Sequence, residues 1–202
     1  MIQIIDYGLG NTGSIFNMLK KIGVESEIVD NPIKLNDGSK YILPGVGSFD
    51  NGMKLLKNNN WIEKLNELII LKKNPILGIC LGMQLMTKSS EEGIIPGLSW
   101  IDADVKKFSF KDNNLKIPHM GWNNINPIKN NKNFYKLNNQ SRFYHVHSYY
   151  VLLNDSSNEI ALTNYSKEFT SSFQKDNIFG VQFHPEKSHK YGMQLLSNFS
   201  KI

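Results

Sequence analysis

Short apolar runs alternate with helical patterns along the first half of this chain, and this alternation is the strongest constraint on its fold. A β-branched run at 2–5 leads into a glycine-rich turn, after which apolar residues recur at i, i+3, i+4 and i+7. The same order then repeats. Strands are expected at 2–5, 24–29, 41–43 and 75–79. The alternation predicts a three-layer α/β fold, with a predominantly parallel sheet flanked by helices and functional loops at the carboxyl ends of its strands.

The second half of the chain has a different character. Strand-like segments at 100–108, 143–153 and 178–183 are separated by polar loops, and we expect antiparallel pairing for some of them. The asparagine-rich stretch at 123–139 predicts an exposed loop, and 189–200 predicts a last helix. A length of 202 residues is close to that of one domain, so we expect a single domain over 1–202.

Composition and charge exclude several classes of protein. The formal net charge is +5, but Arg142 is the only arginine among 23 basic residues, and readout of bases relies on arginine, so we expect no nucleic-acid partner. No apolar run approaches the roughly 20 residues of a membrane span. The N-terminus lacks the basic and apolar segments of a signal peptide. We therefore expect a soluble, cytoplasmic protein.

Cys80 is the single cysteine, which excludes a disulfide framework and a cysteine-rich metal site. A lone cysteine is most often a small buried hydrophobe. Here, however, Gly78 and Gly82 flank it at i−2 and i+2, the spacing of a nucleophile elbow between a strand and a helix. The start of the helix favours a thiolate at this point. The pattern therefore makes Cys80 a candidate nucleophile.

A thiolate nucleophile needs a base, and the base needs a group that orients it. His184 ends an apolar run, and Glu186 follows two residues later, so this pair is the best candidate for those roles. His145 and His147 share one face of a predicted strand and could bind a metal, but no third ligand is evident, so no metal is expected. Each histidine could instead be structural. The five histidines are His119, His145, His147, His184 and His189.

The loop at 44–49 follows a strand and carries two glycines, so its backbone N–H groups can approach an anion. During attack on a carbonyl the relevant anion is the tetrahedral oxyanion, and the expected donors are the N–H groups near Val46 and Gly47 and that of Leu81. The alternative of a dinucleotide loop at 8–13 is weak, because a phosphate there would share the site with the elbow.

Three segments together resemble the signatures of the class I (triad) glutamine amidotransferases. They are Leu-Pro-Gly-Val-Gly at 43–47, Pro-Ile-Leu-Gly-Ile-Cys-Leu-Gly-Met-Gln at 75–84 and Gly-Val-Gln-Phe-His-Pro-Glu-Lys-Ser at 180–188. Three more are similar to segments of the glutaminase subunits of imidazole glycerol phosphate synthases. These are Asp-Tyr-Gly-Leu-Gly-Asn at 6–11, Ile-Pro-His-Met-Gly-Trp-Asn at 117–123 and Val-His-Ser-Tyr at 146–149. The resemblance spans essentially the whole chain.

The resemblance implies a class I glutamine amidotransferase-like fold, with Cys80, His184 and Glu186 as a triad that hydrolyses glutamine through a thioester and needs no cofactor. It implies a heterodimer in which ammonia passes to a synthase barrel that makes imidazole glycerol phosphate and aminoimidazole carboxamide ribotide, in histidine biosynthesis. The residues implied for glutamine binding are Gly45, Gln84, Ser148 and Tyr149. Those implied for the partner interface are Trp122, Tyr144 and Lys187.

Two departures from the family pattern leave the identity of the partner open. A larger apolar residue is expected after Asn11, where the chain has Thr12-Gly13, and an aromatic residue is more usual at His145. One alternative is a paralogous glutaminase that supplies ammonia to a different barrel for amidination of surface sugars. A second alternative is a non-catalytic regulatory subunit, in which the triad would be incomplete. A third is a stand-alone cysteine hydrolase or peptidase, which would use the same nucleophile elbow without a partner.

Overall fold

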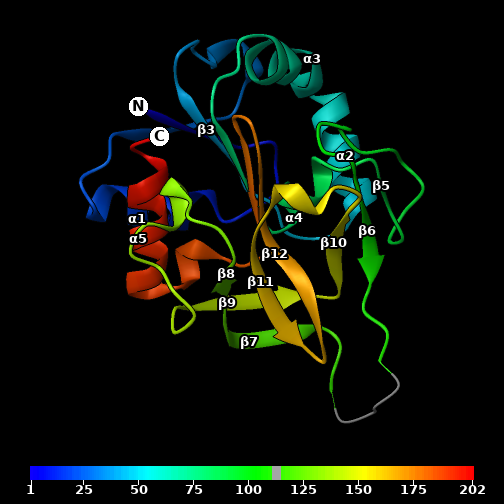
Figure 1. The fold of residues 1–202 in the computed structure, drawn as a ribbon. Helices are drawn as coiled ribbons and strands as arrows, with labels where there is room; N and C mark the ends of the chain where they lie inside the picture. Colours follow the sequence, from blue (N-terminus) through cyan, green and yellow to red (C-terminus); the bar gives the residue numbers. More distant parts are fainter. Residues whose placement is uncertain (111–114) are drawn as a thin grey trace.

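The computed structural model describes residues 1–110 and 115–202. One mixed sheet runs through the molecule, and helices cover both faces of its parallel half (Figure 1). This half has the strand order β2-β1-β3-β4-β13, and all its neighbouring strands are parallel. Its strands are β1 (Ile2–Ile5), β2 (Ser26–Val29), β3 (Lys40–Leu43), β4 (Ile76–Ile79) and β13 (Ile178–Val181). The expected α/β class and its parallel sheet are confirmed.

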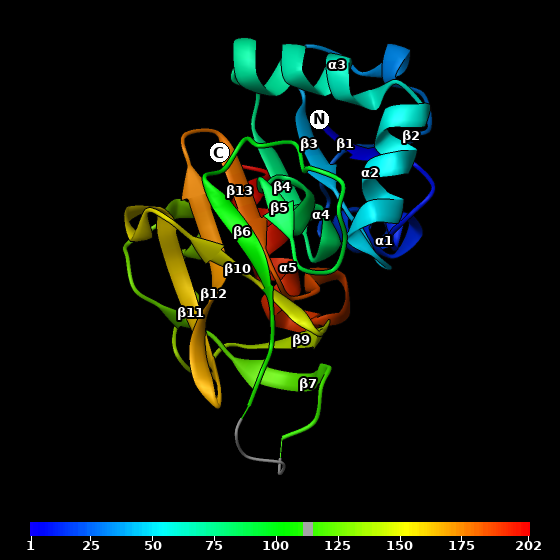
Figure 2. The same cartoon turned by 90° about the vertical axis from the view of Figure 1, so that its right-hand side faces the viewer.

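Helices lie on both faces of the parallel strands (Figures 1 and 2). On one face are α1 (Thr12–Lys21) and α5 (His189–Phe199), and on the other are α2 (Phe49–Asn58) and α3 (Trp61–Leu65), which continues as a π-helix over Asn66–Leu71. Successive strand residues point to opposite faces. Ile76 of β4 therefore packs with the core under α2 and α3, whereas Leu77 packs with the core under α1 and α5.

The start of α3 differs from the sequence pattern, in which Asn60 and Glu63 have the spacing of a capping box. Asn60 has a left-handed backbone, with φ of 58°, and its side chain accepts no hydrogen bond from the helix. Asparagine tolerates this conformation better than most residues. Asn60 therefore acts as the turn residue between α2 and α3.

The second half of the chain adds antiparallel strands to the sheet, as expected. β12 pairs with β13, β10 and β11, and β10 pairs with β6. A separate two-stranded sheet joins β7 and β9. The strands of this half are β5 (Ser89–Ser90), β6 (Ala103–Lys107), β7 (His119–Asn124), β8 (Asn126–Pro127), β9 (Arg142–His147), β10 (Tyr149–Leu153), β11 (Glu159–Tyr165) and β12 (Lys167–Lys175).

The segment 143–153, expected as one strand, is two strands in different sheets. Ser148 separates the two strands: β9 pairs with β7 in the small sheet, and β10 joins the large sheet. Both segments are rich in aromatic residues and valine, which favour strands, so residue type does not reveal the break. The break matters because it exposes the backbone at 147–149 to the site described below.

The expectation of an exposed loop at 123–139 is wrong in part. This stretch holds the end of β7, strand β8 and a 3-10 helix at Lys132–Phe134. Ile125, Phe134 and Leu137 are buried in the core under α1 and α5. The side-chain amide of Asn198 in α5 donates to the carbonyl of Asn133, at 2.9 Å, and so ties the stretch to the helix. Irregularly spaced apolar residues anchor a segment whose composition is polar.

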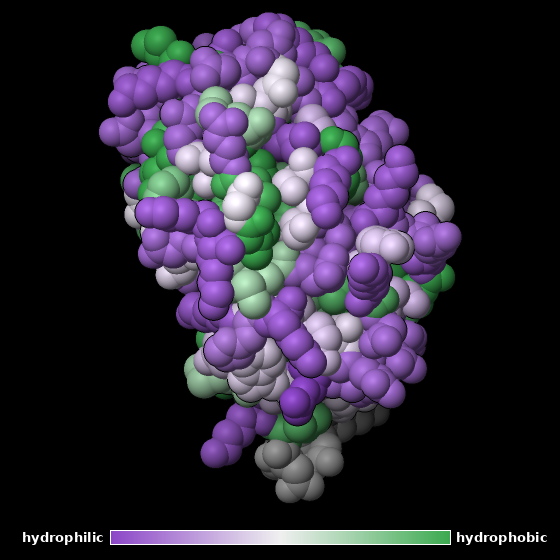
Figure 3. Space-filling model, turned by 90° about the vertical axis from the view of Figure 1, so that its left-hand side faces the viewer, coloured by the Kyte–Doolittle hydropathy of each residue, from purple (hydrophilic) through white to green (hydrophobic). Residues whose placement is uncertain are grey.

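The surface on the side of α1 and α5 is mostly hydrophilic, with smaller apolar areas between the polar side chains (Figure 3). Among the described residues, no helix has the length and apolar character needed to cross a membrane. The carboxyl ends of β4 and β13 lie side by side, because Ile79 pairs with Val181. The segments that follow these two strands carry Cys80 and His184.

Candidate active site

Cys80 lies at the sharp turn between β4 and α4 (Leu81–Leu85), with φ of 54° and ψ of −112°. A Cβ on Gly82 would lie 1.8 Å from the carbonyl oxygen of Leu43, and a Cβ on Gly78 would lie 2.8 Å from the carbonyl oxygen of Gly82. Neither position tolerates a side chain. The two glycines are therefore steric requirements of the elbow, which holds Cys80 in a strained backbone conformation.

His184 and Glu186 form a buried pair beside the elbow. Nδ1 of His184 lies 2.7 Å from Oε1 of Glu186, and the two side chains are 2% and 1% exposed. The side-chain amide of Asn11 donates to the same carboxylate oxygen at 2.9 Å. Burial raises the pKa of Glu186, but the hydrogen bonds from His184 and Asn11 outweigh burial and lower it. Asn11 lies in the quoted opening motif, but the sequence gives no sign of this contact.

The charge on Cys80 controls the protonation of His184. Burial lowers the pKa of His184, but attraction to a Cys80 thiolate, with the hydrogen bond to Glu186, outweighs burial and raises the pKa above its ordinary value. Nε2 of His184 is buried and has no hydrogen-bond partner among the described residues. Within the described part of the chain, Nε2 of His184 is therefore free of other partners on the side of the site that holds Cys80.

A pocket of about 320 Å³ opens beside the sulfur. The residues that line it are Val46, Gly47, Cys80, Leu81, Gln84, Glu92, Pro118, Val146, His147, Ser148, Tyr149 and His184. The structure thus brings the three expected oxyanion donors together with three of the four residues expected to bind glutamine. Leu81 is the first residue of α4, so its N–H is one of those that a helix leaves unsatisfied at its start. The pocket has the size that suits a small ligand.

Gly45 is the expected glutamine-binding residue that does not line this pocket. A Cβ at this position would lie 2.8 Å from the backbone nitrogen of Gly82 and 2.8 Å from the hydroxyl of Tyr7. Gly45 therefore lets the loop at 44–49 pack closely against the elbow, behind the pocket wall.

Residues 3–202 match the family described as Glutamine amidotransferase class-I. The chain belongs to the class I glutamine amidotransferases. Among its relatives is the "Imidazole glycerol phosphate synthase subunit HisH 2" of Methanococcus maripaludis, 54% identical over 201 residues, which cover 100% of this chain and 99% of that one. The subunit with the same description from Pseudomonas aeruginosa is 46% identical over 202 residues, with both chains covered completely.

Solved structures share the fold of this class I amidotransferase. The structure of PurLQS from Thermotoga maritima matches with a TM-score of 0.73 and 17% identity, covering 99% of this chain and 97% of that chain. The glutaminase domain of Trypanosoma brucei CTPS with bound acivicin matches with a TM-score of 0.64 and 16% identity, covering 99% and 93%. At such identities the likeness shows the fold alone, and it agrees with the fold that the sequence motifs imply.

A chain of amide contacts links Cys80 to the pocket wall. The amide of Gln182 donates to Sγ of Cys80 at 3.7 Å, and Nε2 of Gln84 donates to Oε1 of Gln182 at 3.0 Å. Nε2 of Gln84 also lies 3.3 Å from the carbonyl oxygen of Tyr149. Any contact of Gln84 with a substrate therefore falls to its Oε1. Gln182 and Glu92 are site residues that the sequence reasoning missed, since neither has a distinctive spacing.

The three residues expected at the partner interface gather on one side of the triad. Trp122 in β7 pairs with Tyr144 in β9, and their ring centroids are 6.1 Å apart. Nζ of Lys187 lies 5.6 Å from the centroid of Tyr144. The backbone N–H of His184 donates to the carbonyl of Tyr144 at 2.9 Å. This cluster, Trp122–Tyr144–Lys187, is thus directly connected to His184, and Trp122 is 45% exposed.

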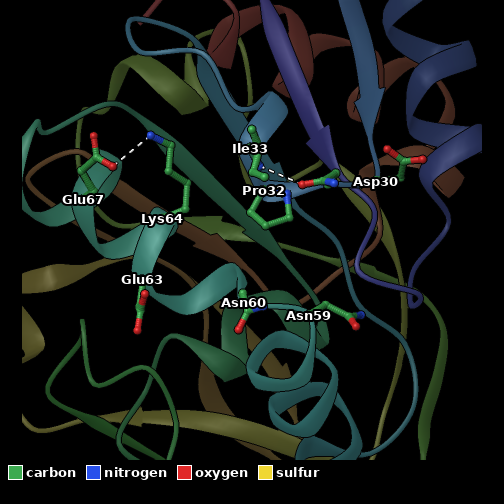
Figure 4. Close-up of a pocket in the computed structure, with 9 residues that line it drawn as sticks. Asp30, Pro32, Ile33, Asn59, Asn60, Glu63, Lys64 and Glu67 are labelled. Carbon is green, nitrogen blue, oxygen red and sulfur yellow. Dashed lines mark hydrogen bonds and ion pairs between the residues drawn. The ribbon is translucent and has the colours of Figure 1, made fainter.

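Two other places in the amidotransferase, a second pocket and the loop at 8–13, lack the groups of the site around Cys80. A pocket of about 790 Å³ is larger than the one beside Cys80, but the described residues that line it include no cysteine or histidine, and its Lys64 and Glu67 form an ion pair with each other (Figure 4). Its lining residues are Asp30, Asn31, Pro32, Ile33, Asn59, Asn60, Glu63, Lys64 and Glu67. The loop at 8–13 is not a phosphate cradle, because a Cβ on Gly10 would lie 2.8 Å from Pro44. That loop packs against the expected oxyanion loop.

His119 lies beside His145 and His147, and the sequence did not reveal this proximity. Its ring lies in a buried cluster with those of His145 and His147 behind the pocket wall. Burial lowers the pKa of His119 to about 4 and that of His147 to about 3, and it lowers the pKa of His145 well below its ordinary value. All three imidazoles are therefore neutral near pH 7.

Proposed function

We propose that this chain is the cytoplasmic glutaminase subunit of an imidazole glycerol phosphate synthase. It hydrolyses glutamine to glutamate and ammonia, and the ammonia passes to a partner synthase barrel in histidine biosynthesis. The observation that carries the chemistry is the elbow thiol beside a buried histidine–carboxylate pair, facing a pocket with backbone donors. The similarity over the full chain to HisH subunits supports the pathway.

In the first half of the reaction, the Cys80 thiolate attacks the side-chain carboxamide carbon of glutamine. The carbonyl oxygen becomes an oxyanion, which the N–H groups of Leu81 and the Val46–Gly47 loop stabilise. The C–N bond then breaks as His184 gives its Nε2 proton to the departing nitrogen. Ammonia leaves, and the glutamyl group stays on the sulfur as a thioester.

In the second half, acylation removes the negative charge that raised the pKa of His184. His184 is then a neutral base oriented by Glu186, and it takes a proton from water that attacks the thioester carbon. Collapse of the second tetrahedral intermediate releases glutamate and restores the thiolate. One histidine thus serves as acid and then as base because the charge beside it changes.

The pocket offers partners for the charged ends of glutamine. Glu92 is the carboxylate of the pocket outside the triad, and it suits the α-ammonium group of the substrate. Its Oε2 also accepts the backbone N–H of Phe49 at 2.8 Å, which anchors its position. The backbone around Ser148 and Tyr149, with Oε1 of Gln84, provides polar contacts for the rest of the substrate.

The partner would dock on the Trp122–Tyr144–Lys187 cluster. Exposed aromatic side chains are enriched at protein interfaces, and this cluster includes a half-exposed tryptophan next to the backbone that holds His184. Docking there would let the barrel receive ammonia and sense the state of the triad. We infer a heterodimer from this placement and from the subunit names of the relatives.

A second candidate is a paralogous subunit that supplies ammonia to a different barrel. The relatives from M. maripaludis and P. aeruginosa carry the number 2, which distinguishes one copy of a subunit from another. A regulatory subunit without catalysis is disfavoured, because the chain keeps all three expected triad residues, with Cys80 and His184 lining one pocket and His184 hydrogen-bonded to Glu186. A stand-alone peptidase is disfavoured by the small volume of the pocket, about 320 Å³.

The deciding experiment measures glutamate release from glutamine by the purified chain, alone and with the imidazole glycerol phosphate synthase barrel of its own organism plus the ligand of that barrel. We expect little activity alone and marked stimulation by the barrel. An absence of stimulation, with Cys80 still alkylated by a glutamine-analogue label, would support the paralogous partner. Failure of both would overturn the glutaminase assignment.

A further inference from the structure

Three buried histidines converge in the small sheet of β7 and β9. His119 is the direct cross-strand partner of His147, and His145 lies two residues before His147 on the same face. The residue opposite His145 is Gly121, which has no side chain, so the ring of His119 stacks on that of His145 with centroids 4.5 Å apart. One ring nitrogen of each histidine lies within 4.8 Å of one nitrogen of each of the others.

The closest of these separations suit a metal ion. Nδ1 of His119 and Nδ1 of His145 each lie 3.2 Å from Nε2 of His147. Nitrogens bound at 2.0–2.1 Å in tetrahedral geometry are about 3.3 Å apart. In addition, Nδ1 of His147 lies 2.8 Å from the carbonyl oxygen of Tyr149, to which it donates. Such a backbone acceptor fixes the tautomer of a metal-binding histidine and leaves the lone pair of Nε2 directed at the cluster.

Hydrogen bonds alone leave this cluster unsatisfied. Nε2 of His147 has a single lone pair, and two Nδ1 atoms compete for it. A cation among the three rings would engage all three lone pairs at once.

We propose that His119, His145 and His147 form a binding site for a late first-row divalent cation, Zn²⁺ being the physiological candidate. The ligand set is three imidazoles without a carboxylate, which selects zinc, nickel, copper or cobalt over calcium and magnesium. His147 also lines the catalytic pocket, so the ion is reached from the pocket and a water fills its fourth position. The site is separate from the Cys80–His184–Glu186 triad.

Metal binding at this cluster requires the side-chain amide of Asn123 to rotate. When Nδ1 of His119 binds the ion, the proton of this imidazole moves to Nε2, which lies 3.2 Å from the side-chain nitrogen of Asn123. The amide must then turn so that its oxygen accepts this proton. The turn costs the 2.9 Å bond to the carbonyl of Asn164 and the 2.8 Å bond that the oxygen accepts from the backbone N–H of Asn124. Asn123→Asp supplies an acceptor without that rotation and should tighten metal binding about tenfold.

The test is a Co²⁺ titration of the full chain carrying Cys80→Ala, so that neither the thiol nor its pairing with His184 contributes. We expect the visible absorption bands of tetrahedral Co²⁺ to saturate at one ion per chain and to vanish when Zn²⁺ displaces the cobalt. His145→Phe, which restores an aromatic ring without a ligand, should abolish the bands. His189→Phe removes a histidine outside the cluster and should leave them unchanged.

The proposal is overturned if the chain shows no stoichiometric bands, or if the bands persist in His145→Phe. Circular dichroism establishes that each variant is folded. Should His145→Phe not fold, His145→Gln enters the same comparison, because it keeps a polar side chain in the cluster. The glutaminase assay is independent of these outcomes, so the metal site and the proposed function stand or fall separately.

Discussion

At the scale of single residues, the charge on Cys80 decides what His184 can do. Negative charge on Cys80 raises the pKa of the His184 imidazole against the effect of burial, and Glu186 binds Nδ1, which leaves Nε2 for the proton transfers proposed above. The elbow, the histidine and the carboxylate are all evident from short sequence motifs. Asn11, which donates to Glu186, is not, because it is 175 residues away in the chain.

Replacing the nucleophile should separate the two activities of the assembled complex. We expect Cys80→Ala to lower glutamine-dependent synthesis by about 10⁴-fold or more, because no other residue forms the thioester. Synthesis from added ammonium should continue, since the barrel does not use the thiol. Steady-state assays with each nitrogen source check this. Loss of the ammonium-dependent rate as well would mean that Cys80 is needed for assembly.

The buried histidine cluster should make the fold sensitive to acid. The folded-state pKa values of His119 and His147 are about 4 and about 3, below the ordinary value of 6.5, so the unfolded chain binds more protons between these values. The contribution of these two histidines to the free energy of unfolding is therefore fully present above about pH 6.5. It is lost as the pH falls toward 4, by up to about 1.4 kcal/mol per pH unit for each histidine.

Urea unfolding at pH 7.5 and pH 5.0, in the presence of a chelator, measures this loss. His145→Phe should lose less stability between the two pH values than the unmodified chain, because it removes one of the groups that take up a proton on unfolding. Equal losses in both proteins would show that the cluster does not titrate as its burial requires.

At the scale of elements, glycine positions decide how closely the elbow can pack. The spacing Gly78-x-Cys80-x-Gly82 predicts the turn, and the structure supplies its reason, which is contact with the backbone of β3 and α4. Periodicity identified most strands and helices of the parallel half. It missed the break at Ser148 and the buried part of 123–139, because both depend on which sheet a strand joins.

Two glycine-to-alanine variants should have opposite effects on the free energy of unfolding. Gly82→Ala should lower it by about 3 kcal/mol, because the new methyl group would overlap the carbonyl oxygen of Leu43. Gly13→Ala should raise it by about 0.5–1 kcal/mol, because Gly13 lies in α1 with open space around it and alanine favours the helix. Urea denaturation of both variants tests the pair, and similar effects would contradict the steric account.

At the scale of the whole molecule, the parallel sheet brings the triad together and the antiparallel half closes the pocket. β4 and β13 are neighbours, so the loops after them meet, although Cys80 and His184 are about a hundred residues apart in the chain. The β7–β9 sheet adds both the Trp122–Tyr144–Lys187 cluster and the histidine cluster. The extent of the domain, 1–202, stays a prediction.

Loss of the exposed tryptophan should weaken association with the barrel. We expect Trp122→Ala to raise the dissociation constant at least tenfold, because a half-exposed indole beside Tyr144 has the character of an interface hot spot. Leu152→Ala, at an apolar side chain of similar exposure on β10, is the matched control. Titration calorimetry measures both, and equal affinities of the two variants would place the interface elsewhere.

The sequence by itself determined the α/β class, the family and the elbow and predicted the triad, because each rests on spacing within a few residues and on local steric and electrostatic requirements. Only the tertiary structure decided that Asn11 supports Glu186, that Gln182 and Gln84 link the thiol to the pocket wall, and that His119 joins His145 and His147. These contacts join segments far apart in the chain. They depend on strand order and register, which periodicity along one segment does not encode.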